Sequence, residues 1–172
     1  MTSLVIRAAK PADMPALSAV YRRSSLSNDG DRPDLLANPE FLEFSDLAVR
    51  EGRTRVATAG DRVVGFATWL AAGGGVVEVE DLFVDPGWMR QGIGTALVLD
   101  LIEIVRDAGA RRAEVTGNRH ALAFYRSVGF TLDHEVATTL GSGLRMHLDI
   151  TRADRGPAGP WPSGPQGRRS GR

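Results

Sequence analysis

Two glycines separated by one residue, Gly92 and Gly94, stand where a strand-like segment gives way to the longest helical pattern of the chain. The first N–H groups of a helix have no acceptor within the helix, and the helix dipole favours an anion there. Glycine lets a phosphate approach the main chain, because no Cβ stands in the way. This spacing therefore predicts a cradle for a diphosphate group.

Two common nucleotide-binding loops do not fit this stretch. A Walker A loop needs Lys-Ser or Lys-Thr after its last glycine, whereas Gly94 is followed by Thr95-Ala96. The dinucleotide fingerprint needs Gly or Ala where Leu97 stands, and a tight turn where seven residues separate Val84 from Gly92. A diphosphate of another kind and a plain strand–loop–helix connection both remain open.

Two blocks of sequence help to decide between a diphosphate-binding loop and a plain connection. The first runs from Asp81 to Leu97 and reads DLFVDPGWMRQGIGTAL, and the second runs from Asn118 to Phe130 and reads NRHALAFYRSVGF. Together they resemble the GNAT superfamily of N-acetyltransferases, whose phosphate loop reads Gln/Arg-x-x-Gly-x-Gly/Ala and whose later block reads Asn-x-x-Ala-x-x-Phe-Tyr-x-x-x-Gly-Phe. One position departs from the pattern: Met89 occupies the Gln/Arg position, with Arg90 and Gln91 beside it. The departure affects one side-chain contact to phosphate and leaves the main-chain cradle intact.

The resemblance implies that acetyl-CoA lies in an opening between the fourth and fifth strands. Main-chain groups before the loop would pair with the pantetheine; these belong to Leu82, Phe83 and Val84. Main-chain groups of the loop would hold the pyrophosphate; these belong to Arg90, Gln91, Gly92, Ile93, Gly94 and Thr95. An N–H of the strand would also polarise the thioester carbonyl. Asn118 and Tyr125 would line the opposite wall, with Tyr125 as the general acid that protonates the departing thiolate. Simpler roles also stay open: a solvated side chain for Arg90, a helix cap for Asn118 and a core aromatic for Tyr125.

An amine acceptor needs a base, because an alkylammonium is almost entirely protonated at neutral pH. Three acids precede the loop, and we rank them as bases in the order Glu80, Glu78, Asp81. The run from Glu80 to Val84 is similar to the equivalent stretch of polyamine acetyltransferases, where the first acid is a base candidate. Strand alternation puts Glu78 and Glu80 on one face unless a bulge resets the phase. The alternative is that these acids cover a solvated strand face.

The elements that must position these residues follow from hydrophobic periodicity, with glycine and proline at the breaks. We expect strands at 4–8, 53–59, 63–71, 76–84 and 112–116, helices at 11–24, 94–108 and 120–128, a weaker helical zone at 33–50, and a final hairpin from 130–138 to 144–150 that turns at Gly141-Ser142-Gly143. This order is that of a mixed α/β domain. The resemblance implies the GNAT acyl-CoA N-acyltransferase fold, a mixed, mostly antiparallel central sheet flanked by helices.

The composition fits one globular domain. The chain has 172 residues, 21 basic and 21 acidic side chains, and no cysteine. Zero net charge gives no field that would attract nucleic acid or an anionic membrane, and the lack of cysteine excludes thiolate metal sites and a Cys nucleophile. The three histidines are too widely spaced for a typical metal site, so we expect no metal. Residues 1–150 form the predicted N-acetyltransferase domain, and residues 151–172, rich in Gly, Pro and Arg, form a predicted disordered tail.

These observations predict an enzyme that moves the acetyl group of acetyl-CoA directly to a primary amine, most simply that of a small molecule. A protein N-terminus or lysine is the second candidate acceptor, and a non-catalytic acetyl-CoA-binding regulator is the rival from another class. No apolar run is long enough to span a membrane and no export signal is visible, so we expect a cytoplasmic, bacterial protein. A homodimer is left open. The aromatic residues that could line an acceptor pocket are Phe41, Phe44, Trp69 and Trp88.

Overall fold

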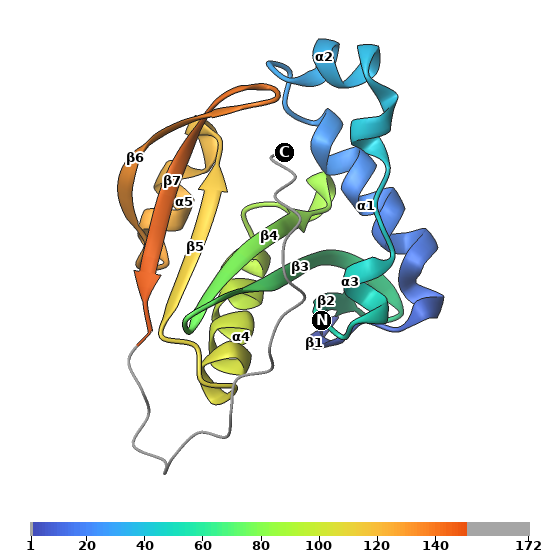
Figure 1. Ribbon diagram of the computed structural model, residues 1–172. Coiled ribbons are helices and arrows are strands. Elements are labelled where there is room, and N and C mark those ends of the chain that lie inside the picture. Colours follow the sequence, from blue (N-terminus) through green and yellow to red (C-terminus); the bar gives the residue numbers. More distant parts are fainter. Residues whose placement is uncertain (1, 151–172) are drawn as a thin grey trace. The chain divides into compact units, whose positions relative to one another are not determined.

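The computed structural model describes residues 2–150, and the predicted tail lies outside the described residues. Helices and strands alternate along the chain (Figure 1). In order they are β1 Leu4–Ala8, the 3-10 helix η1 Pro11–Asp13, α1 Met14–Leu26, α2 Arg32–Ala37, η2 Pro39–Leu42, α3 Leu47–Arg50, β2 Thr54–Ala59, β3 Arg62–Gly73, β4 Val76–Val84, η3 Pro86–Trp88, α4 Ile93–Asp107, β5 Arg112–Gly117, η4 Arg119–Ala121, α5 Leu122–Ser127, β6 Thr131–Thr138 and β7 Gly141–Asp149.

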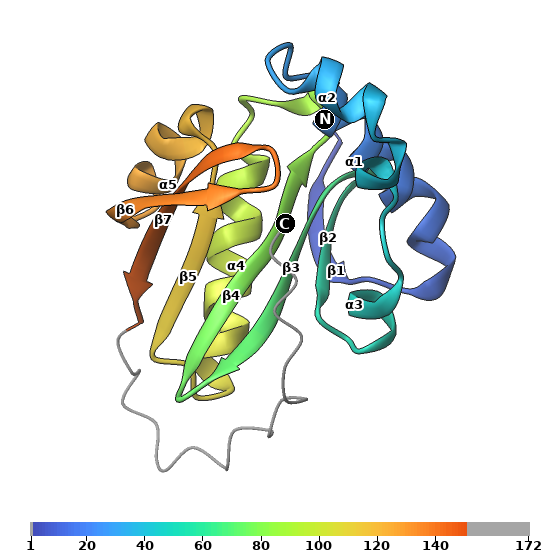
Figure 2. The same ribbon diagram turned by 45° about the horizontal axis from the view of Figure 1, so that its top comes forward.

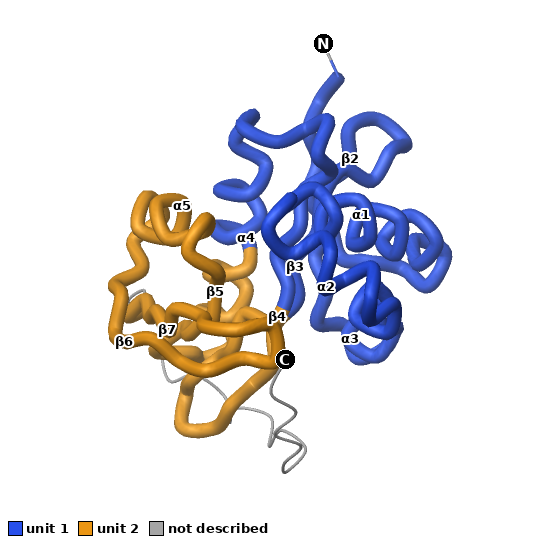
Figure 3. Tube along the Cα trace, turned by 90° about the horizontal axis from the view of Figure 1, so that it is seen from above, with its two compact units in different colours: residues 1–68, 81–100 blue, residues 69–80, 101–172 orange. Residues whose placement is uncertain are grey.

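Seven strands form one sheet of order β1-β2-β3-β4-β5-β7-β6. β4 and β5 pair in parallel, whereas the pairs β1–β2, β2–β3, β5–β7 and β6–β7 are antiparallel. The predicted fold class, a mixed and mostly antiparallel sheet with helices, is confirmed. The chain divides into two compact units, and the boundaries between them fall within β3, β4 and α4 (Figure 3).

Unit 1 holds the described residues up to Thr68 together with Asp81–Asp100. Its core forms where α1 and α3 pack against β2 and β3, next to the edge strand β1 (Figure 2). α1 contributes Leu17 and Val20, both fully buried, because apolar residues three and four apart share one face of a helix. The buried members of this core are Leu17, Val20, Val49, Val56, Val63 and Phe66.

Unit 2 holds Trp69–Glu80 and the described residues from Leu101 onward. In it β5, β7 and β6 lie side by side, and α5 packs against one face of them (Figures 1 and 2). That face is apolar and includes Val77, Val79, Ala113, Val115 and Met146, all buried. Residues that alternate with them face the other way and are largely charged, as expected for strands with one buried face.

The final hairpin turns at a different place from the one the sequence predicts. Gly141-Ser142-Gly143 lies inside β7, and residues 139–140 make the turn. A Cβ on Gly143 would lie 2.8 Å from Thr116 Cγ2 and 2.9 Å from Thr138 Cγ2. Glycine here permits close approach of the neighbouring strands, a cause that a local pattern does not distinguish from a turn.

The helix predicted at 11–24 begins as a separate 3-10 turn, and α1 extends to Leu26. The carboxylate of Asp13 holds that turn by accepting the N–H of Lys10 at 2.7 Å and a bond from Arg7 at 2.8 Å. Within residues 2–150 no helix has the length and apolar character needed to cross a membrane. The same residues contain no group of three or more metal-binding side chains placed to hold an ion.

Candidate active site

The predicted diphosphate cradle is the loop between β4 and α4, and all of it lies in unit 1. Asp85, the first residue after β4, fixes the beginning of this loop. Its N–H donates to Val64 O at 2.8 Å, and its Oδ1 accepts the N–H of Gly87 at 3.1 Å. The second bond caps η3, so the chain leaves the sheet in a defined direction.

Left-handed backbone shapes the loop just before α4. Gly92 has φ +79°, and Arg90, with φ +60°, is the one non-glycine residue of the described chain with a positive φ. Ala96 N–H donates to Gly92 O at 3.0 Å at the start of α4. The N–H groups of Ile93, Gly94 and Thr95 precede it and have no acceptor within the helix. Apart from its chain neighbours, no described residue places an atom within 4 Å of where a Cβ on Gly92 would stand. This open turn at the first N–H groups of a helix fits a pyrophosphate.

A charged pair joins α1 to the start of the loop. Arg23 donates to Asp85 Oδ2 from Nη2 at 2.5 Å and from Nε at 3.2 Å, and Arg62 Nη2 lies 3.5 Å from the same oxygen. Burial raises the pKa of the Asp85 carboxyl, since the residue is only 4% exposed. The bonds from Arg23 and the Gly87 N–H, aided by the charge of Arg62, outweigh burial and hold that pKa below its usual value. Asp85 is therefore a charged anchor of the loop.

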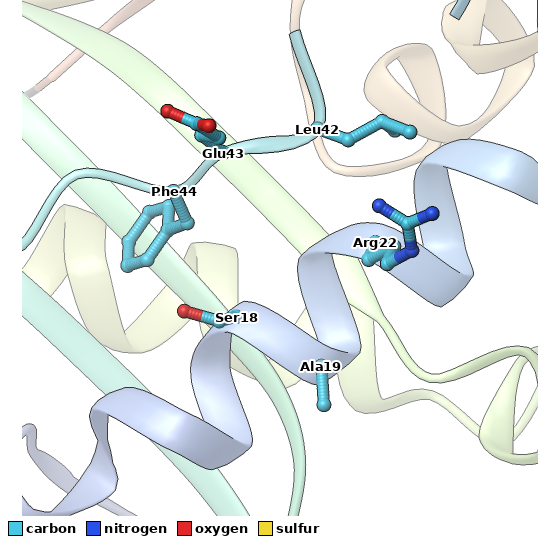
Figure 4. Close-up of a pocket in the computed structure, with 6 residues that line it drawn as sticks. All are labelled: Ser18, Ala19, Arg22, Leu42, Glu43 and Phe44. Atoms are coloured by element: carbon cyan, nitrogen blue, oxygen red, sulfur yellow. The ribbon is translucent and has the colours of Figure 1, made fainter. Parts of the chain in front are cut away.

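A groove of about 500 Å³ lies beside α1 in the same unit (Figure 4). Ser18, Ala19 and Arg22 follow one another along α1, and the segment Leu42–Phe44 runs opposite them. Phe44 stacks in a tilted arrangement on Tyr21 at 5.6 Å between ring centroids, and Tyr21 meets Phe83 of β4 edge-on at 4.9 Å. Of the four aromatic residues considered for an acceptor pocket, Phe44 lines this groove.

Tyr125 lies in unit 2, on α5, and is only 6% exposed. Its ring meets those of Phe124 and Phe130 edge-on, with centroids 5.1 Å and 5.3 Å away. Gly117 of β5 approaches the ring closely, because a Cβ there would lie 3.4 Å from Tyr125 Cε2. These contacts agree with the role of Tyr125 as a core aromatic, and they also hold its ring in one orientation. The general-acid role stays a prediction.

Asn118 follows β5 in the same unit. Its Oδ1 accepts the N–H of Ala121 at 2.9 Å and so caps η4. The capping alternative is thereby confirmed. A contact between Asn118 and acetyl-CoA stays a prediction.

The three candidate bases have different surroundings. In unit 2, Glu78 accepts two bonds from Arg145, at 2.6 Å and 2.7 Å. In unit 1, Asp81 Oδ2 accepts the hydroxyl of the fully buried Thr68 at 2.6 Å. Glu80, in unit 2, is exposed, whereas the other two acids are half-buried. Glu80 is therefore the most exposed of the three acids, and its first rank as the base stays a prediction.

Sequence reasoning missed Arg23, Thr68 and Arg145, each of which holds an acid far away in the chain. Their partners are 62, 13 and 67 positions distant, respectively. The one local signal is that Arg145 stands between Leu144 and Met146, which marks it as the polar side of an alternating strand. Nothing in a single sequence tells which carboxylate lies opposite.

Comparison with known proteins identifies the protein family to which the chain belongs. The profile of the acetyltransferase (GNAT) family matches residues 16–130, which include the loop and the block at Asn118–Phe130. Glucosamine 6-phosphate N-acetyltransferase of Trypanosoma brucei brucei is 35% identical over 104 residues, 55% of this chain and 71% of that protein. The uncharacterized N-acetyltransferase YvbK of Bacillus subtilis is 34% identical over 107 residues, 59% of this chain and 68% of its own length.

Solved structures share the fold. The PaiA N-acetyltransferase of Thermoplasma acidophilum, in complex with coenzyme A, has a TM-score of 0.69 at 19% identity and covers 86% of this chain and 99% of its own. The ribosomal-protein-S18-alanine N-acetyltransferase of Escherichia coli has a TM-score of 0.63 at 22% identity, with 88% and 96% covered. Because the family profile spans more than half of the sequence, this chain belongs to the GNAT family and is an acetyl-CoA-dependent acyltransferase.

Proposed function

We propose that this enzyme transfers the acetyl group of acetyl-CoA directly to the primary amine of a small molecule. The observation that carries the proposal is the left-handed turn at Arg90 and Gly92, which leads into α4 and has open space among the described residues where a Cβ on Gly92 would stand. Main-chain groups of Leu82, Phe83 and Val84 pair with the pantetheine in this proposal, and those from Arg90 to Thr95 hold the pyrophosphate. Arg90 also supplies a charge close to the phosphates.

In the proposed reaction the amine nitrogen bonds to the acetyl carbon while the carbon–sulfur bond breaks. Glu80 takes the proton that the amine gives up, directly or through a water, because it is the most exposed of the three candidate acids on β4. The Tyr125 hydroxyl protonates the thiolate as it leaves. An N–H of β4 polarises the thioester carbonyl, as donors of an oxyanion hole do. Neither side chain forms a covalent bond to the acetyl group.

The groove beside α1 is the proposed acceptor site. Arg22 on α1 and Glu43 opposite it are exposed and make no ion pair within residues 2–150. Ala19, Leu42 and Phe44 give the groove an apolar floor. One cation, one anion and an apolar floor suit a small amine that also carries an acidic group, which Arg22 would hold. A relative named for glucosamine 6-phosphate agrees with such an acceptor.

The test is release of free CoA thiol from acetyl-CoA by the full chain with a panel of amines. The panel pairs aminosugar phosphates with the same aminosugars lacking phosphate, and adds polyamines and peptides with free N-termini. We expect turnover with small amines, and a preference within each pair for the member with the acidic group. Turnover with peptides alone would move the acceptor to protein, and no release with any amine would favour an acetyl-CoA-binding regulator.

A further inference from the structure

Arg145 ties three strands of unit 2 together. It lies on β7 opposite Thr116 of β5, and its guanidinium donates to both carboxylate oxygens of Glu78, at 2.6 Å and 2.7 Å. The same group donates to Glu114 at 2.5 Å and to Thr116 Oγ1 at 3.1 Å. A planar guanidinium that satisfies one carboxylate at both oxygens also fixes where that carboxylate lies.

This contact stands where the parallel pairing of β4 and β5 ends. The register runs from Val76 opposite Arg112 to Val79 opposite Val115, with Glu78 and Glu114 as partners in the pair before the last. Two negative charges thus face each other across neighbouring strands. Like charges directly opposite destabilise a sheet, so the guanidinium between them is what lets both acids remain there.

The carboxyl groups of Glu78 and Glu114 have pKa values that are shifted in opposite directions. Burial raises the pKa of the Glu78 carboxyl above its usual value, although the bonds and charge of Arg145 act to lower it, and the charges of Glu114 and Glu80 raise it further. The pKa of Glu114 is raised by burial, but the bonds and charges of Arg145 and Arg112 outweigh burial and lower it. The other charged or titratable groups beside this pair are His147 on β7, and Asp133 and His134 on β6.

We propose that Arg145 is a positioning residue that holds Glu78 as a paired carboxylate and so leaves proton acceptance from the amine to Glu80. The inference rests on the proposed function, because it concerns which acid serves as the base. Glu78 and Glu80 lie two residues apart on β4, and an unpaired negative charge at Glu78 would repel the negative charge of the Glu80 carboxylate. Arg145 removes this repulsion, because its guanidinium neutralises the charge of the Glu78 carboxylate.

Arg145→Met is the direct variant, and Arg145→Lys and the double variant Arg145→Met with Glu78→Gln accompany it. Arg112→Met is the matched control, because Arg112 also bonds Glu114, at 3.0 Å, but leaves the Arg145–Glu78 pair intact. The readouts are the pH profile of kcat/KM with an active amine, and the titration of the Glu78 carboxyl followed by carbon NMR.

In Arg145→Met we expect the acid limb of the profile to move to higher pH, so that kcat/KM falls about tenfold more at pH 6 than at pH 8. The double variant should restore the wild-type profile, because no charge remains at position 78. Arg145→Lys should fall between the two, since an ammonium keeps the charge but loses the two-point contact. Arg112→Met should keep the wild-type profile.

A profile in Arg145→Met that matches the wild type, with an unchanged titration of Glu78, would overturn the inference and leave the proposed function standing. An equal shift in Arg112→Met would also overturn it, because any loss of positive charge would then suffice. If the wild-type enzyme turns over no amine, the proposed function fails instead. The carboxyl titration then still decides whether Arg145 controls Glu78.

Discussion

Removing the charge of Asp85 separates the two ways in which this residue anchors the phosphate loop. Asp85→Asn keeps an oxygen that can accept the Gly87 N–H but no longer attracts Arg23. Asp85→Ala removes the cap and the charge together. Arg23→Met removes the cation and leaves the carboxylate with Arg62 as its remaining neighbour of opposite charge.

The expected loss of stability follows from burial. Breaking a buried ion pair by removing one partner costs about 3–5 kcal/mol, and the Asp85 side chain is 5% exposed. The Arg23 side chain is 50% exposed, so water already solvates part of the pair and we expect about 1–3 kcal/mol for Asp85→Asn. Asp85→Ala should lose about 1 kcal/mol more, the typical worth of a helix cap.

The pH dependence has a definite sign. The pKa of Asp85 is lowered in the folded protein, so its charge stabilises the fold above the usual carboxyl pKa, and this stabilisation is lost as the pH falls through the folded value. The difference in melting temperature between Asp85→Asn and wild type should therefore be full at neutral pH and shrink in acid.

Thermal melting followed by circular dichroism across pH measures these differences. Arg50→Met is the matched control, because Arg50 and Asp46 form an exposed pair, 62% and 52% accessible, and such pairs contribute at most about 0.5 kcal/mol. Equal melting of Asp85→Asn and wild type at neutral pH would refute the anchoring role, as would a difference that persists unchanged at acid pH.

Three further predictions concern acetyl-CoA binding, Tyr125 and Asn118. Acetyl-CoA at a hundred times its Kd should stabilise the enzyme by about 2.7 kcal/mol, and Gly92→Val should abolish this shift. Gly52→Val, at φ +71° and also in open space, should be strained to a similar degree but keep it; equal loss in both would deny the cradle. Tyr125→Phe should lower kcat by about 10²-fold or somewhat less with little change in acetyl-CoA affinity, and a wild-type rate when chemistry limits turnover would return Tyr125 to a core role. Asn118→Ala should cost about 1 kcal/mol in urea denaturation through loss of the cap on the Ala121 N–H, and a neutral result would contradict that bond.

Local pattern was sufficient for the elements around the loop. The strand predicted at 76–84 is β4 as observed, and the helix predicted at 94–108 is α4 shifted by one residue at each end. Apolar periodicity and glycine breaks determine such elements, so one sequence carries the information. The turn predicted at Gly141-Ser142-Gly143 was wrong because glycine there serves contact with another strand.

The contacts that distinguish the three candidate acids could not be predicted. Glu78, Glu80 and Asp81 are neighbours in the sequence, yet one meets Arg145, one is exposed and one meets Thr68. Those partners come from other strands and are set by register, which a single sequence specifies only through the whole fold. The sequence therefore supports a set of three acids, and their ranking needs the structure and the experiment.

Direct transfer from acetyl-CoA to the amine is tested by comparing the amount of acetylated product with that of released thiol while the mass of the protein is followed. With an active amine, we expect one N-acetylated product for each CoA thiol released. We also expect an unchanged protein mass after incubation with acetyl-CoA alone, because no side chain of the site takes the acetyl group. An acetyl group found on the protein and passed on to the amine, or thiol released without acetylated amine, would contradict direct transfer.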